Sequence, residues 1–250
     1  MAEVPKVAMV FAAGLGTRMR PLTNDRPKAL VEVDGRTLLD HLLDRLAAAG
    51  VEVAVVNAFH FAPALIAHLA TRAGRAPRIV ISDESHLAEP LETEGGLVQA
   101  LPLLEAALAA TGGDDAIFTC NADAIWVEPT ILQRMAQTWD PARMKGLLML
   151  AALETSLGFD GPGDFFQDAA GALTRRGDAP AAPYAYAGVQ LTLLSHFRDR
   201  APGKRSLARI WFDSWAPSGQ LHGLALEGQW LHVGDPAARD AAEAWLRAHA

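Results

Sequence analysis

The sequence has a single cysteine, no excess of basic residues and no long apolar run, and each absence excludes a class of protein. Cys120 has no second cysteine with which to form an internal disulfide or a metal-binding pair. The 22 Lys and Arg are outnumbered by 29 Asp and Glu, a formal net charge of -7, which argues against nucleic acid as a partner. Even the apolar run 7–14 is too short for a signal segment or a membrane span. We therefore expect a cytoplasmic protein that binds neither nucleic acid nor a membrane.

Apolar strands and amphipathic helices alternate over the first 153 residues. Such alternation, with short connections, is typical of βαβ units around a mainly parallel sheet that binds ligands at the carboxyl ends of its strands. We predict an α/β fold, a Rossmann-like three-layer sandwich. The predicted strands are 7–13, 51–57, 78–82, 116–121 and 146–153, and the predicted helices are 38–49, 63–71, 95–108 and 129–139.

The pattern changes after residue 153, where Gly, Asp, Ala and Pro become frequent. A turn at 169–171 predicts a hairpin, residues 184–192 alternate as a strand, and residues 224–233 predict a second hairpin that turns near Gly228. The chain closes with a helix in which Asp235 is the N-cap and Pro236 the first residue. No linker is long enough to separate independent units, so we predict one domain over residues 1–250.

A glycine-rich turn follows the first strand, in the segment "AAGLGTRMRPLTNDRPKAL". Gly14 and Gly16 leave backbone N–H groups open to an anion, because no Cβ stands in the way. Arg18 and Lys28 add a bidentate guanidinium and a point-charge ammonium, which suit a polyphosphate. Neither a Rossmann fingerprint nor a Walker A loop fits the spacing. A solvated basic surface turn is the alternative.

Residues 12–50 resemble the signature of the nucleoside-triphosphate:sugar-1-phosphate nucleotidyltransferases, G-x-G-T/E-R-M-R-P-L-T followed by P-K-P/A-L. The resemblance implies a fold of the nucleotide-diphospho-sugar transferase type. It further implies that Arg18 and Lys28 are catalytic, because in that family they contact the phosphates. The nucleotide-binding residues that it implies in the loop are Ala12, Ala13, Gly14, Gly16 and Thr17.

The segment "LETEGG" begins at Leu91 and opens a predicted helix. Its acidic residues, Glu92 and Glu94, could simply complement the helix dipole. The segment is also similar to that of the N-acetylmuramate-1-phosphate uridylyltransferases within the same family. By this similarity Glu92, Thr93 and Gly95 lie beside the base and ribose of the nucleotide.

A carboxylate at the end of a buried strand, Asp123 in "FTCNADAIW", is costly unless it is paired or bound to a cation. A turn or N-cap role is the alternative. The family has N-G-D here, whose Asp holds Mg²⁺, so the resemblance implies that Asp123 is a catalytic metal ligand and that Asn121 binds nucleotide. Ala122 replaces the family's glycine.

Many relatives have W-x-D near the C-terminus, where this chain carries His232. The resemblance places His232 with Asp123 in the metal site. A packed core histidine is the alternative, and imidazole is a poorer Mg²⁺ ligand than carboxylate.

Two weaker segments resemble the sugar site of the muramate enzymes, "GPGDFF" from Gly161 and "YAYAGVQL" from Tyr184. They imply that Gly163, Asp164 and Gly188 bind the sugar. A plain hairpin loop is the alternative for the first segment.

The resemblance implies transfer of a nucleotidyl group, with Mg²⁺ as cofactor, from a nucleoside triphosphate to a sugar 1-phosphate. Residues 1–125 would form the nucleotide-binding half and residues 126–250 the sugar-binding half. We expect UTP and N-acetylmuramate 1-phosphate, in peptidoglycan recycling, and a monomer or small homo-oligomer. Alternatives are a mannose-1-phosphate guanylyltransferase, a glucose-1-phosphate thymidylyltransferase, or a non-catalytic nucleotide-sugar-binding regulatory protein.

Overall fold

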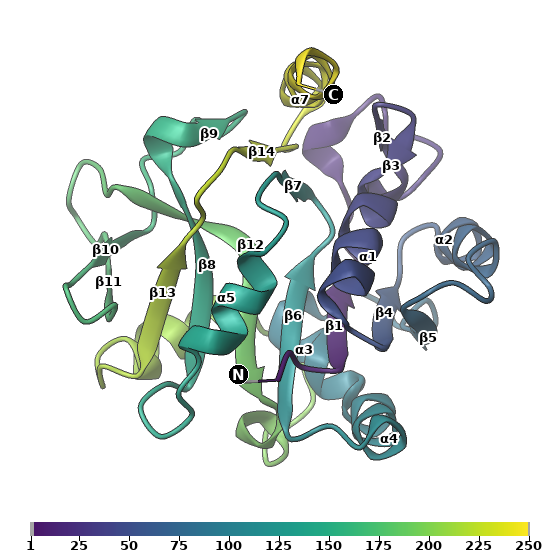
Figure 1. Cartoon of the computed structure of the whole chain (residues 1–250). Coiled ribbons are helices and arrows are strands. Elements are labelled where there is room, and N and C mark those ends of the chain that lie inside the picture. Colours follow the sequence, from purple (N-terminus) through teal and green to yellow (C-terminus); the bar gives the residue numbers. More distant parts are fainter. Residues whose placement is uncertain (1–2, 250) are drawn as a thin grey trace.

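A sheet of nine strands forms the centre of the computed structural model, which describes residues 3–249 (Figure 1). Its main strands follow the order β5, β4, β1, β6, β12, β8, β13, and all are parallel except β12, which is antiparallel to both neighbours. The predicted α/β fold with a mainly parallel central sheet is therefore confirmed. The bounds are Val7–Phe11 (β1), Val53–Ala58 (β4), Arg78–Asp83 (β5), Ala116–Asn121 (β6), Gly146–Ala152 (β8), Tyr184–Leu193 (β12) and Leu221–Ala225 (β13).

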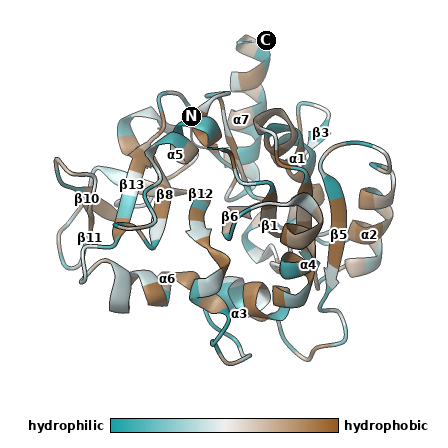
Figure 2. Cartoon of the chain, turned by 60° about the horizontal axis from the view of Figure 1, so that its bottom comes forward, coloured by the Kyte–Doolittle hydropathy of each residue, from teal (hydrophilic) through white to brown (hydrophobic). Residues whose placement is uncertain are grey.

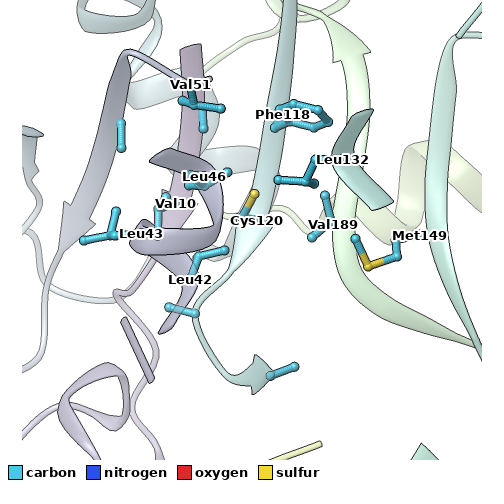
Figure 3. Packing of buried hydrophobic residues seen from close by; sticks show 14 of the residues in the cluster. Val10, Leu42, Leu43, Leu46, Val51, Phe118, Cys120, Leu132, Met149 and Val189 are labelled. Carbon is cyan, nitrogen blue, oxygen red and sulfur yellow. The ribbon is translucent and has the colours of Figure 1, made fainter. Parts of the chain in front are cut away.

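Helices cover both faces of the sheet, because its parallel strands are apolar on both sides. In β1, Ala8 and Val10 face one core while Val7 and Met9 face the other. Figure 3 shows the first core, where leucines of α1 pack toward the strands, and in Figure 2 the strands are mostly brown between the helices. The first face carries α1 (Leu38–Ala49), α2 (Ala62–Ala70) and α5 (Ile131–Thr138), and the second carries α3 (Glu92–Gln99), α4 (Leu101–Thr111), α6 (Leu207–Ile210) and the π-helix η5 (Trp211–Trp215).

The helix α1 shows how local sequence sets an element. Thr37 caps its N-terminus by accepting a hydrogen bond from the Asp40 backbone N–H at 3.0 Å, and Gly50 ends it at a φ of 98°. Its carboxylates, Asp40 and Asp44, each accept a hydrogen bond at 2.5 Å from the buried Arg72 guanidinium. The residues after α2 are thereby tied to α1. No helix within residues 3–249 combines the length and apolar character that a membrane span requires.

A three-stranded sheet beside the central one joins distant parts of the chain. It consists of β7 (Ala124–Trp126), β14 (Trp230–His232) and β9 (Ser156–Leu157), and a small core that includes Met19, Val33 and Leu231 packs it against α7 (Pro236–Ala248). The last helix begins as predicted, because Asp235 Oδ1 accepts a hydrogen bond from the Ala238 N–H at 2.9 Å. The remaining short elements are η1 (Thr17–Met19), η2 (Lys28–Leu30), β2 (Glu32–Val33), β3 (Arg36–Thr37), η3 (Leu153–Thr155) and η4 (Leu194–Phe197).

The second half of the chain contains one correct and one wrong hairpin prediction. The turn at 169–171 does join an antiparallel pair, β10 (Phe165–Gln167) and β11 (Leu173–Arg175). The hairpin predicted over 224–233 is wrong, because β13 pairs in parallel with β8 whereas β14 pairs with β7 and β9. Apolar runs on either side of Gly228 are each buried, but in different sheets.

The helix predicted over 95–108 is also wrong in detail. It is two helices, α3 and α4, that meet at Ala100, and α3 begins at Glu92. Pro102 lies in the first turn of α4, where its missing N–H costs nothing. The helical turns of α6 and η5 were not predicted, because the run 207–215 is rich in tryptophan and lacks a clear helical period.

Candidate functional site

A cavity of about 460 Å³ opens where β1 and β6 end. This is the edge at which an α/β sheet binds ligands. Its wall is formed by the glycine-rich turn, the start of α3 and the residues after β6. The predicted site residues that line it are Ala12, Ala13, Gly14, Gly16, Thr17, Arg18, Lys28, Glu92, Thr93, Asn121 and Asp123.

The glycine-rich turn is shaped by Gly16, which adopts a φ of +62°. A Cβ there would lie 3.1 Å from the Lys28 Cβ, and the Gly16 carbonyl accepts a hydrogen bond from Thr23 Oγ1 at 2.8 Å. At Gly14, by contrast, an added Cβ would meet no described atom within 4 Å, so a ligand can approach that backbone. Gly16 thus serves the loop's packing and Gly14 leaves it open.

A buried asparagine, Asn57 at the end of β4, holds the start of this turn. Its Oδ1 accepts hydrogen bonds from the N–H groups of Ala12 (2.8 Å) and Ala13 (3.2 Å), while its Nδ2 donates to Glu84 Oε1 at 3.0 Å. Burial raises the pKa of Glu84, partly offset by the hydrogen bond from Asn57. We did not predict a role for Asn57. The sequence does indicate one, because Asn57 is a polar residue at the end of an apolar strand, the same pattern that pointed to Asp123.

The predicted catalytic lysine and carboxylate meet in the cavity. Lys28 Nζ lies 3.2 Å from Asp123 Oδ2, although 95 residues separate them in the chain. The Lys28 side chain is 14% exposed and that of Asp123 is 34% exposed, so both are reachable from the cavity. Arg18 lies on the exposed side of the turn. Two cations, Arg18 and Lys28, and two carboxylates, Glu92 and Asp123, therefore line a common space.

His232 lies next to Asp123 in a strand ladder. It pairs with Ala124 across β14 and β7, and the Val233 N–H donates to the Asp123 carbonyl at 3.3 Å. The Nδ1 atom of His232 is buried and has no hydrogen-bond partner within residues 3–249. Burial lowers the pKa of this imidazole, and nearby Lys28 and Arg18 lower it further against the opposing effect of Asp123. These effects together favour the neutral form of the ring.

Asp123 is the predicted carboxylate ligand for a divalent cation here, and Glu92 and Asn121 add oxygen atoms to the same cavity lining. The described part of the chain contains no cluster of three or more His, Cys, Asp and Glu side chains that could hold a metal. Mg²⁺ commonly takes one or two carboxylates and completes its shell with substrate phosphates and water, which this donor set permits. A neutral imidazole is a weak addition to such a site. Asp123 therefore fits Mg²⁺, and the assignment of His232 stays a prediction.

Gly95 lies away from the cavity, unlike its neighbours Glu92 and Thr93. A Cβ at Gly95 would come within 2.4 Å of the Gly203 carbonyl oxygen, and its N–H donates to the Arg205 carbonyl at 3.0 Å. The residue is thus accounted for by packing against a distant segment. A direct contact between Gly95 and nucleotide stays a prediction.

The three predicted sugar-binding residues lie outside the cavity lining as well. Gly163 has a φ of +81° and Asp164 Oδ2 accepts a hydrogen bond from the Tyr186 N–H at 2.9 Å, so both hold a loop in shape. Gly188 lies in the irregular part of β12, where a Cβ would be 3.4 Å from that of Asn121. Gly188 is therefore the one of the three that adjoins a cavity residue.

Comparison with known proteins gives matches to the sequence and to the fold. Residues 8–152 match the MobA-like NTP transferase domain. An N-acetylmuramate alpha-1-phosphate uridylyltransferase of Caulobacter vibrioides is 49% identical over 250 residues, covering 98% of the chain and 99% of that protein. A Neisseria meningitidis protein of the same name is 42% identical over 97 residues, 39% of the chain and 41% of that protein. The inositol-1-phosphate CTP transferase of T. maritima superposes with a TM-score of 0.75 at 15% identity, covering 97% of the chain and 96% of that structure.

Proposed function

The chain belongs to the MobA-like NTP transferase family and is a nucleotidyltransferase, and from this premise we propose that it transfers a uridylyl group from UTP to N-acetylmuramate 1-phosphate. The products would be UDP-N-acetylmuramate and pyrophosphate. The choice of base and sugar rests on the Caulobacter vibrioides relative, which aligns with nearly the whole chain. We further propose that the reaction serves peptidoglycan recycling in the cytoplasm.

The observation that carries the proposal is the Lys28–Asp123 pair beside the open glycine-rich turn. An ammonium, a guanidinium from Arg18 and free backbone N–H groups at one cavity suit a triphosphate. The protein is acidic as a whole, so this local group of cations is what would meet a polyanion.

The chemical step needs positioning rather than a general base. An oxygen of the sugar phosphate attacks the α-phosphorus of UTP, a new P–O bond forms, and the bond to pyrophosphate breaks. A phosphate monoester has a second pKa of about 6, so the nucleophile is already mostly dianionic at neutral pH. Lys28 would reduce the repulsion between the two anions and Arg18 would hold the leaving pyrophosphate.

We propose Mg²⁺ as the cofactor, held by Asp123. When bound it would neutralise phosphate charge and bring the two substrates' phosphates together. Asp123 keeps one oxygen within reach of Lys28 Nζ and presents the carboxylate to the cavity. We propose His232, in the strand beside it, as a weaker nitrogen ligand.

Pyrophosphate release tests the proposal. The purified protein with Mg²⁺ is given UTP, GTP or dTTP in combination with N-acetylmuramate, mannose or glucose 1-phosphate. We expect the highest kcat/KM for UTP with N-acetylmuramate 1-phosphate. A higher value for GTP with mannose 1-phosphate, or dTTP with glucose 1-phosphate, would assign another substrate. A nucleotide-induced rise in Tm without pyrophosphate release in any combination would instead indicate a binding protein.

A further inference from the structure

Glu94, in the first turn of α3, is a buried carboxylate joined to two arginines from a distant segment. Its Oε1 accepts hydrogen bonds from Arg200 Nε at 2.8 Å and Arg205 Nε at 3.0 Å, and Arg200 Nη2 lies 2.7 Å away. The Glu94 side chain is 0% exposed, whereas those of Arg200 and Arg205 are 37% and 27% exposed. A charge buried this completely is retained only with such partners.

Backbone hydrogen bonds join the same two segments. The N–H groups of Glu94 and Gly95 both donate to the Arg205 carbonyl, at 2.9 and 3.0 Å, and the Arg205 N–H donates to the Leu91 carbonyl at 3.0 Å. Leu207 N–H donates to Thr93 Oγ1 at 2.9 Å. The start of α3 is therefore hydrogen-bonded to residues 205–207. In Figure 2, α3 and α6 lie at the same side of the molecule.

This junction lies directly behind the cavity wall. Pro90, Glu92 and Thr93 line the cavity, and Glu94 is the next residue along the chain. Glu92 has a φ of +64°, a left-handed conformation that residues with a Cβ seldom adopt. Such a conformation persists where the surroundings determine it. The buried ion pairs of Glu94 supply those surroundings on one side of Glu92.

We infer that Glu94 is a positioning residue for the nucleoside triphosphate. Through Arg200 and Arg205 it holds Glu92 and Thr93 at the cavity, while making no contact with substrate itself. The inference rests on the proposed function, in which this wall receives the nucleoside. The phosphate-binding side of the cavity, with Lys28 and Asp123, belongs to other elements.

Glu94→Gln tests the inference, because it keeps an oxygen acceptor and the side-chain length but removes the charge. We expect the dissociation constant for a non-hydrolysable UTP analogue to rise about tenfold, with the dissociation constant for the sugar 1-phosphate unchanged within twofold. The matched control is Glu89→Gln. It removes the Lys204–Glu89 pair at 2.7 Å, which joins the same segments but is 45% and 63% exposed. An exposed pair contributes little, so the control should match the wild type.

A second variant, Arg200→Lys, guards against misfolding of the first. It leaves the Arg205 contact intact. We expect it to weaken nucleotide binding about threefold, a smaller loss than in Glu94→Gln, again without an effect on the sugar 1-phosphate. Equal changes in the nucleotide and sugar-phosphate constants, or unchanged nucleotide affinity in a folded variant, would overturn the inference. The binding measurement needs no turnover. If the wild type binds the analogue but releases no pyrophosphate with any substrate pair, the proposed function fails and the role of Glu94 is still decided.

Discussion

Replacing Lys28 by methionine separates catalysis from folding. Methionine keeps most of the apolar stem, which packs against the glycine-rich turn near Gly16, and removes the charge 3.2 Å from Asp123. If Lys28 stabilises the charge that develops during transfer, its loss should lower kcat/KM by about 10²–10³, the effect typical of removing one such group. That corresponds to about 2.7–4 kcal/mol of transition-state stabilisation.

The expected effect on stability is much smaller. Asp123 is 34% exposed, so water screens the pair, and pairs of this kind contribute about 1 kcal/mol or less to folding. For a chain of 250 residues such a loss lowers Tm by about 2–4 °C. Pyrophosphate release gives the catalytic loss, and urea unfolding gives the stability loss on the same preparation.

Lys6→Met is the matched control. Lys6 lies just before β1, at the opposite end of the strand from the cavity, and pairs with Glu3 and Glu52. Its loss should leave turnover unchanged. The reasoning is refuted if Lys28→Met keeps more than a tenth of wild-type kcat/KM, or if its unfolding free energy falls as much as its activation free energy rises.

Three further predictions test other parts of the structure. Asn57→Leu removes the acceptor of two buried N–H groups, so the free energy of unfolding in urea should fall by about 2–4 kcal/mol and the affinity for nucleotide should fall with it. Wild-type stability together with wild-type affinity would contradict this role of Asn57. Burial alone would raise the pKa of Asp40, but hydrogen bonds that include one from Arg72 hold it below its usual value. The stability that Asp40 contributes is thus present above about pH 4 and lost below it. The difference in free energy of unfolding between the wild type and Asp40→Asn should therefore become smaller from pH 7 to pH 3. Gly163→Ala should lower the free energy of unfolding by about 2 kcal/mol or more, because its Cβ would lie 2.2 Å from a carbonyl oxygen. Gly74 has the same φ of +81° but open space among the described atoms, so Gly74→Ala should lower it by only about 1 kcal/mol. Equal losses would show that the backbone conformation alone matters.

Much of the nucleotide-binding half was predictable, because its signals are local. The run of apolar residues in β1 and the leucine spacing of α1 each depend on neighbours within a few positions. The same holds for the glycine-rich turn. A carboxylate placed at the end of a buried strand pointed to Asp123, and the same reasoning extended to β4 would have found Asn57.

The second half was predicted less well, because the pairing of its strands depends on tertiary packing. The runs around Gly228 look alike in sequence, yet β13 extends the central sheet and β14 joins the small one. The predicted sugar-binding residues Gly163 and Asp164 shape a loop outside the 460 Å³ cavity. No local sequence pattern distinguishes these strand pairings, since the competing pairings bury similar side chains.

By itself, then, the sequence determined the alternation of strands and helices, the open glycine-rich turn and the chemistry of the side chains that follow it. The tertiary structure decided which of them share a cavity. Lys28 and Asp123 are 95 residues apart and meet because β1 and β6 end at one edge of the sheet. Glu94 and Arg205 are 111 residues apart and meet because residues 205–207 pack against the start of α3. Such contacts depend on how the layers pack, and packing energies are set by the whole core rather than by any single segment.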